Sequence, residues 1–121
     1  MILPDWIADL FAAIDRKDAD AFAEFVTEDA HFAFGNLPAV AGRTAIREFV
    51  AGFFASIKAV SHRVPDAWLS GGTVVCRGEV AYTRHDGSML TVPFANVFLM
   101  AGDRVRDYRI YMDASALFAA S

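Results

Sequence analysis

Hydrophobic residues recur at helical spacing in the first half of the chain. Three segments carry apolar residues three or four positions apart, as the buried face of an amphipathic helix requires. We predict helices over residues 4–16, over 18–25 with Asp18 as the capping residue, and from Thr44, as a cap, to Ile57. The third helix has the widest apolar stripe, which consists of Ile46, Phe49, Val50, Phe53, Phe54 and Ile57.

The second half of the chain alternates between apolar and polar residues, which is typical of strands. We predict strands over 60–69, 73–84, 89–100 and 105–113, after a short extended segment at 31–34. Strands of twelve residues span about 40 Å and must curl in a domain of this size. Gly78 and Pro93 are the expected positions of a bend or bulge. A short helical tail, capped by Asp113, should end the chain.

Alternation also predicts which side chains share a face. In the last strand, one face carries Arg106, Tyr108, Ile110 and Met112, and the other face carries Asp107, Arg109, Tyr111 and Asp113. A hairpin centred on Asp86 and Gly87 would pair Glu79 with Phe94 and Arg77 with Asn96.

Helices first and an antiparallel, curled sheet afterwards indicate an α+β fold. The 121 residues form one domain, residues 1–121, which is long enough to bury a core of its own. A strongly curved sheet that wraps around helices encloses a cone.

Composition narrows the functional classes. Hydrophobic residues make up 55% of the chain and include eleven Phe, which favours a lined cavity, a buried subunit interface or both. The net charge of -4, without a run of Lys or Arg, argues against nucleic acid and against an anionic membrane as partners. The single Cys76 excludes an intramolecular disulfide and, with no basic leader or long apolar span, favours a cytoplasmic protein. The three His are too scattered to predict a metal site, and no cofactor motif occurs.

The order of elements and three segments resemble a known family. The segments are FAEFVTEDAHFAF with GRTAIREFVAGFF, the hairpin EVAYTRHDGSMLTVPFANVF, and DRVRDYRIYMD. They are similar to the cone-shaped nuclear transport factor 2-like, or SnoaL-like, superfamily, which includes ketosteroid isomerases, limonene epoxide hydrolases and polyketide cyclases. The resemblance implies three helices in a curved antiparallel sheet, a short C-terminal helix, an apolar pocket and a homodimer that packs through the outer face of the sheet, including Val80 and Tyr82.

Most catalytic residues of these relatives have no counterpart here. The resemblance places Phe34 where the isomerases have a base Asp, and Leu10 where they have an oxyanion Tyr. Asn96 replaces their second oxyanion donor and can still donate a hydrogen bond. The epoxide hydrolase positions read Ala81, Glu79, Ile110, Phe32 and Phe34, so that chemistry is not expected.

Two functions follow as alternatives. In the first, the protein is a cofactor-free, isomerase- or cyclase-like enzyme in which Glu79 is the general acid or base and Asn96, with Tyr108, polarises a carbonyl. In the second, it is a non-catalytic module that binds a ligand or dimerises, and Glu79 only pairs with Arg77 or Arg63. In both, a small hydrophobic ligand would contact a pocket formed by Leu10, Phe32, Phe34, Phe54, Ala81, Phe94, Tyr108, Ile110 and Met112. His31 and His62 are either rim or structural residues.

Overall fold

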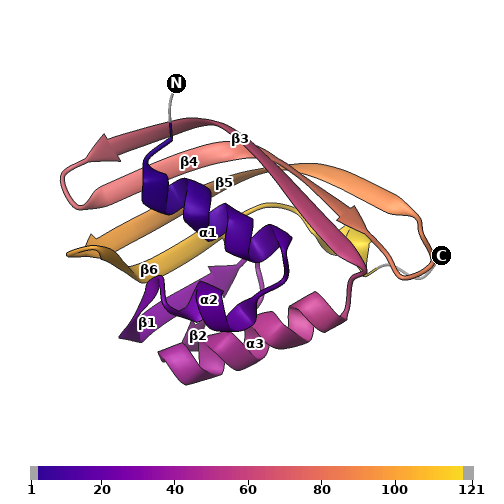
Figure 1. Cartoon of the computed structure of the whole chain (residues 1–121), viewed down its shortest axis with the longest axis horizontal. Helices are drawn as coiled ribbons and strands as arrows, with labels where there is room; N and C mark the ends of the chain where they lie inside the picture. Colours follow the sequence, from indigo (N-terminus) through magenta and orange to yellow (C-terminus); the bar gives the residue numbers. More distant parts are fainter. Residues whose placement is uncertain (1–2, 119–121) are drawn as a thin grey trace.

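The computed structural model describes residues 3–118 and confirms the α+β architecture. Three helices lie on the concave side of one curved, six-stranded sheet (Figure 1). The elements are α1 (Asp5–Asp15), α2 (Ala19–Ala23), β1 (Val26–Phe34), β2 (Val40–Ala41), α3 (Arg43–Ala55), β3 (Ala59–Ser70), β4 (Thr73–Thr83), β5 (Met89–Ala101), β6 (Arg104–Tyr111) and the 3-10 helix η1 (Ser115–Leu117). No helix in this part of the chain is long and apolar enough to cross a membrane.

The sheet is mixed rather than wholly antiparallel. Its strand order is β2-β1-β6-β5-β4-β3, and β1 runs parallel to β6 while the other neighbours are antiparallel. β1 and β6 can run parallel because α3 and the strands β3, β4 and β5 separate them in sequence. This long connection returns the chain to a position beside β1, in the direction in which β1 runs.

The helix ends differ in part from the predicted ones. Asp18 caps α2 as expected, because its Oδ1 accepts a hydrogen bond of 3.0 Å from the backbone N–H of Ala21. Thr44 is not a cap: the capping residue of α3 is Gly42, two residues earlier, whose φ of 92° is accessible to glycine. The C-terminal end of α3 is held by Lys17, whose Nζ donates to the carbonyl oxygens of Phe54 and Ile57.

The predicted apolar stripe of α3 packs into the sheet. The ring of Phe53 lies 5.1 Å from that of Phe34 and 5.8 Å from that of Tyr82, and Phe49 lies 5.8 Å from Phe32. Aromatic contacts of this kind continue through the interior, so much of the core consists of interlocking rings.

The register of the β4–β5 hairpin differs by one residue from the predicted one. Gly78 pairs with Phe94, Glu79 with Pro93, and Cys76 with Asn96. The reason is the turn, which has three central residues instead of two: Arg84 N–H donates to the Ser88 carbonyl at 2.8 Å, and Gly87 has a φ of 89°. A shift of one residue turns every side chain of β4 to the face opposite the predicted one.

Bulges change which side chains face inward on two other strands. In β3 the pairing shifts between Arg63 and Asp66, directly opposite Gly78, so the bulge lies on the strand next to the predicted position. In β6 a shift opposite Leu99 and Met100 leaves Arg106 exposed rather than on the inner face with Tyr108.

Gly78 permits the close approach of β3 to β4. A Cβ atom at this position would lie 1.9 Å from the backbone oxygen of Arg63, a distance that only backbone movement could relieve. We expect Gly78→Ala to lower the free energy of unfolding by at least about 2 kcal/mol, measured by urea denaturation.

Gly52 provides the matched control for this substitution. It lies within α3, and a Cβ atom there would meet nothing within 4 Å. Gly52→Ala should therefore raise the free energy of unfolding by about 0.5–1 kcal/mol through helix propensity. Equal, small effects of the two substitutions would show that β3 does not approach β4 as described.

Candidate functional site

A small cavity lies between the helices and the concave face of the sheet. Its volume is about 50 Å³, more than the 10–15 Å³ or so that a single water needs. Eight of the eleven predicted site residues line it: Phe32, Phe34, Phe54, Phe94, Asn96, Tyr108, Ile110 and Met112. Most of the wall is aromatic or aliphatic, so the cavity favours an apolar molecule.

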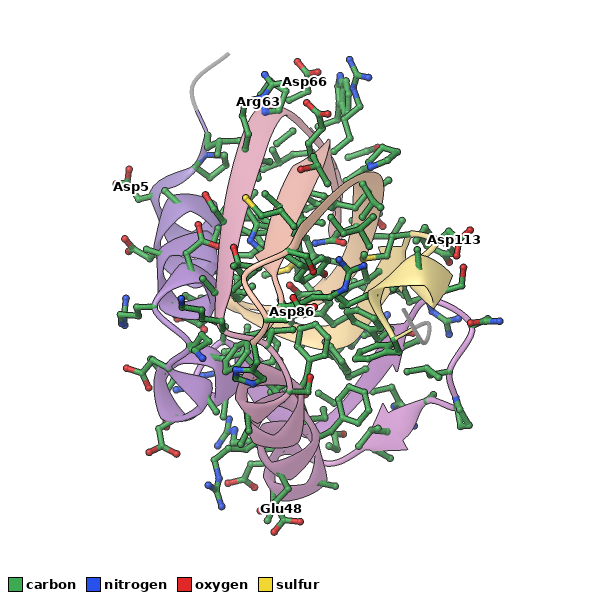
Figure 2. The ribbon with its side chains drawn as sticks, turned by 90° about the vertical axis from the view of Figure 1, so that its right-hand side faces the viewer. Asp5, Glu48, Arg63, Asp66, Asp86 and Asp113 are labelled. Carbon is green, nitrogen blue, oxygen red and sulfur yellow. The ribbon has the colours of Figure 1, made fainter. Side chains whose placement is uncertain are left out.

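The other three predicted residues lie elsewhere. Glu79 is on the outer face, where its side chain is 51% exposed and its Oε1 lies 2.8 Å from Arg63 Nη2. Its predicted position in the pocket was wrong because of the hairpin register, which also turns Ala81 outward. Leu10 is buried in the core but does not line the cavity. Figure 2 shows the labelled Arg63 pointing away from the interior.

The register brings two other side chains of β4 inward. Val80 and Tyr82, which were expected on the outer face, are buried and line the cavity. Tyr82 Oη lies 3.6 Å from Met112 Sδ, so the hydroxyl has only a weak sulfur acceptor.

Two polar atoms of the cavity wall have no partner among the residues that the structure describes. They are Asn96 Oδ1 and Tyr108 Oη, on the neighbouring strands β5 and β6. Asn96 is only 2% exposed and Tyr108 is fully buried. Asn96 pairs with Ile110 and Phe98 with Tyr108, so the two polar side chains are diagonal neighbours on the inner face. Buried polar atoms without partners are costly, and such a pair indicates a binding site for a polar atom.

Burial keeps the phenol of Tyr108 neutral. Desolvation raises its pKa well above the ordinary value, and the neighbouring Cys76 and Tyr82 act in the same direction. The hydroxyl can therefore donate a hydrogen bond at neutral pH. Burial likewise raises the pKa of the Cys76 thiol to about 12, so this cysteine is a protonated core residue rather than a nucleophile.

His62 and Asp15 form a hydrogen-bonded pair at the cavity. One carboxylate oxygen, Asp15 Oδ1, lies 2.6 Å from His62 Nδ1, and the other, Oδ2, accepts from the backbone N–H of His62 at 3.1 Å. Because an ionised carboxylate only accepts, Nδ1 carries the ring proton in the neutral imidazole and Nε2 is a free base.

The surroundings of His62 fix the orientation of its ring. The ring is packed between Phe11 and Phe94, with centroids 4.9 and 5.4 Å away, and the side chain is only 10% exposed. His62 lines the cavity, and no hydrogen bond to Nε2 occurs among residues 3–118. A histidine oriented by a carboxylate is an arrangement suited to general acid–base chemistry.

From the sequence, His62 could be either a residue of the pocket rim or a structural residue, and no pattern pairs it with Asp15. These two residues are 47 positions apart. The available signal was the apolar spacing of the first helix, which places Asp15 one residue after the partly buried Ile14, and the alternation of Val60, His62 and Val64. His31 is exposed, and His85 bonds the carbonyl oxygen of Ala55 at the surface.

Together the fold and the cavity define the class: a cone-shaped α+β domain with an aromatic pocket. Residues 7–108 match the family model of the SnoaL-like domain. The chain belongs to the SnoaL-like domain family, as the sequence resemblance predicted. The comparison with curated proteins found no match.

Solved structures with the same fold include three that illustrate its range. A hypothetical protein of Catenulispora acidiphila with a ketosteroid isomerase-like fold, in complex with trimethylamine, is 18% identical (TM-score 0.84; 91% of this chain and 86% of that chain). A proposed SnoaL-like polyketide cyclase from Jannaschia sp. CCS1 is 22% identical (TM-score 0.79; 92% and 85%). TerC, co-crystallised with polyporic acid, is 18% identical (TM-score 0.79; 92% and 91%). At these identities, the likeness shows the fold alone.

The unpartnered hydroxyl of Tyr108 should lower stability. Tyr108→Phe removes a buried polar atom and keeps the shape of the ring, so we expect the free energy of unfolding to rise by about 1 kcal/mol at pH 7. Stability should also decline less steeply above about pH 10. In the native protein the unfolded state releases the phenolic proton there while the folded state, with its raised pKa, retains it.

The control is Tyr111→Phe, because Tyr111 is on the same strand and exposed. Urea denaturation at several pH values should show no comparable change for this variant. A loss of stability in Tyr108→Phe at pH 7 would mean that the hydroxyl is bonded and not available to a ligand.

Proposed function

We propose that the protein is a cofactor-free enzyme of the isomerase or cyclase type that acts on a small, mostly apolar molecule with one oxygen function. One observation supports this above the others. A histidine that is bonded to a carboxylate lines the same apolar cavity as Asn96 Oδ1 and Tyr108 Oη, two atoms without a partner among residues 3–118. The histidine replaces Glu79, which lies outside the cavity, as the proton carrier.

In the proposed reaction His62 Nε2 takes a proton from a carbon next to a carbonyl group. The electrons of the broken C–H bond move to the carbonyl oxygen, which accepts a hydrogen bond from the neutral phenol of Tyr108. Asn96 Oδ1, the unpartnered atom of this amide on the neighbouring strand, would accept a hydrogen bond from the oxygen when it is protonated as an enol O–H. The imidazolium then returns the proton to another carbon of the enolate. In a cyclase, the enolate carbon instead attacks a second carbonyl group of the same molecule, and the alkoxide that forms on ring closure takes the proton back from the imidazolium.

Asp15 orients the imidazole and stabilises its charged form. It holds Nδ1 and the backbone of His62 at once, so both the tautomer and the ring position are fixed before the substrate binds. The surrounding rings exclude water, which strengthens these interactions.

Proton exchange tests this function without knowledge of the natural substrate. We expect the protein to catalyse exchange of the acidic C–H protons of 1-indanone for deuterium in D2O, followed by proton NMR. His62→Gln should lower the catalysed rate by at least about a hundredfold while ligand affinity stays within tenfold, because it removes the base and keeps much of the shape.

Two further variants separate the proposed roles. Asp15→Asn should also slow exchange, because the amide can no longer fix the same tautomer, whereas His85→Gln should have no effect because His85 is exposed at the surface. Exchange in His62→Gln at the native rate would contradict the mechanism.

A second candidate is a non-catalytic binding module. The small volume of the cavity and its crowded aromatic wall favour this alternative. Binding of 1-indanone without any catalysed exchange would support it.

We also propose that the protein forms a homodimer through the outer face of the sheet. A row of apolar side chains crosses this face, where Trp68 pairs with Val75 and Val75 with Val97. Trp68 is 48% exposed and Tyr111 is 55% exposed, so this face has apolar area that a second copy would cover.

The assembly can be tested by sedimentation. Trp68→Asp should convert the dimer to a monomer at micromolar concentration, because a charge in the centre of an interface of about 1,000 Å² would be desolvated. Leu37→Asp, an exposed position away from the sheet, should leave the dimer intact. A native protein that sediments as a monomer would refute the proposal.

A further inference from the structure

The cavity adjoins a second hollow on the surface. This cleft has a volume of about 440 Å³ and lies between the turn after β1 and the segment after β6. Phe34 and Met112 line both the cavity and the cleft, so these two side chains form the wall between them. A molecule that passes between them would occupy both spaces.

The inner face of β6 leads from the polar pair to this cleft. Tyr108, Ile110 and Met112 follow one another on that face, and only Tyr108 is fully buried while the other two are half-buried. Four residues of a strand span about 13 Å, which exceeds the length of a single aromatic ring. A molecule whose oxygen is bound by Asn96 and Tyr108 must be elongated to reach the cleft.

Two apolar side chains in the lining of the cleft are largely exposed. Leu37 is 45% exposed and Phe118 is 56% exposed, and both line it. They are two of the six large hydrophobic residues that are exposed within residues 3–118. Apolar side chains that gather next to the mouth of a cavity indicate a surface that an apolar ligand covers.

The wall that carries Phe118 is anchored to the rest of the fold. Arg84 donates to the carbonyl oxygens of Ala116 at 2.8 Å and Leu117 at 3.3 Å, which fastens this segment to the end of β4. The ring of Phe118 lies 6.2 Å from that of Phe53 on α3. The cleft is thus formed by contacts with two other elements and not by a loose end.

The charge of the cleft restricts the ligand further. Asp113 lines it, and the backbone N–H of Ser115, 3.0 Å from Asp113 Oδ1, lowers the pKa of this carboxyl, which is therefore ionised at neutral pH. Among residues 3–118, no Lys or Arg lines the cleft or the cavity. A ligand that ends in a carboxylate would be repelled there.

We propose that the ligand of this protein is an elongated, uncharged molecule with a ring that carries a hydroxyl or carbonyl group and with an alkyl or prenyl-like tail. This inference rests on the proposed function, because it places the oxygen at Asn96 and Tyr108 and the ring in the cavity. The tail leaves between Phe34 and Met112 and lies in the cleft against Leu37 and Phe118.

Two phenols that differ only in tail length test the proposal by calorimetry. 4-Ethylphenol has a tail of only two carbons, and 4-hexylphenol adds four methylene groups that would lie in the cleft. Burial of one methylene gives about a fourfold gain in affinity, so four partly buried ones should give at least about tenfold.

The cleft variant is Leu37→Ser with Phe118→Ser. It should lower the affinity for 4-hexylphenol at least about fivefold and leave that for 4-ethylphenol within twofold. Met89→Ser is the matched control, because Met89 is 64% exposed and lies outside both hollows. It should change neither affinity. If the double variant is unfolded by circular dichroism, Leu37→Ser alone should still lower the affinity for 4-hexylphenol by more than twofold.

The outcomes separate the two proposals. Native affinity of the cleft variant for 4-hexylphenol would overturn the tail site while 4-ethylphenol binding leaves the proposed function standing. Tight binding of decanoate, in preference to 4-hexylphenol, would overturn the uncharged ligand class. Absence of binding by both phenols to the native protein would overturn the tail site together with the oxygen site on which it rests.

Discussion

The turn between β4 and β5 decides which side chains the cone encloses. Arg84 N–H closes a three-residue loop on the carbonyl of Ser88, and Asp86 Oδ1 accepts from both the N–H and the hydroxyl of Ser88. Gly87 supplies the positive φ that such a loop needs. With this odd number of loop residues, Val80 and Tyr82 face inward with Asn96, and Glu79 faces outward. A loop shorter by one residue would bring a carboxylate into the cavity instead.

The same arginine connects the turn to the segment beside the cleft. The backbone of Arg84 closes the hairpin, while its side chain holds the carbonyl oxygens of Ala116 and Leu117 beside the cleft. The register of β4 and β5, the inner wall of the cavity and the position of the cleft segment thus depend on one short stretch of chain, residues 84–88. The cavity itself combines interlocking rings, which supply much of the buried apolar area, with two polar atoms, Asn96 Oδ1 and Tyr108 Oη, that have no partner among residues 3–118. Side chains that lower stability in this way are typical of binding sites, because the ligand supplies the missing hydrogen bonds.

The sequence predicted the fold well because the signals for it are local. Apolar spacing located α1, α2 and α3, and alternation located β3, β4, β5 and β6 within two residues at each end. Alternation also predicted that Asn96 on β5, Tyr108 on β6 and Met112 directly after β6 line the inner side. This agrees with the structure because the pairing of β5 with β6 is regular from Asp107 to Tyr111. Alternation does not reveal how many residues form the loop between β4 and β5. A register that differs by one residue therefore reversed which side chains of β4 face inward.

The pairing of Asp15 with His62 could not be predicted from the sequence, although helical spacing and strand alternation indicated that each side chain lies near the interior. Asp15 ends the first helix and His62 lies on an edge strand, and only the curvature of the sheet brings them to 2.6 Å. Bulges had a similar effect: the one opposite Gly78 lets Val64 and Ala67 stay on the inner side despite their odd spacing. Tertiary structure thus brings the polar side chains at the cavity together, whereas the positions of the core residues can be predicted from local sequence pattern.

A crystal structure with bound 4-ethylphenol would test the central claim most directly, since it shows where the oxygen and the ring lie. The account predicts the phenol oxygen within about 3.2 Å of both Tyr108 Oη and the Asn96 amide, with the ring between them and His62. It also predicts that His62 Nε2 faces the ligand while Nδ1 stays bonded to Asp15. A ligand bound on the outer face beside Glu79, or an Asn96 side chain that is bonded only to its own protein, would contradict it.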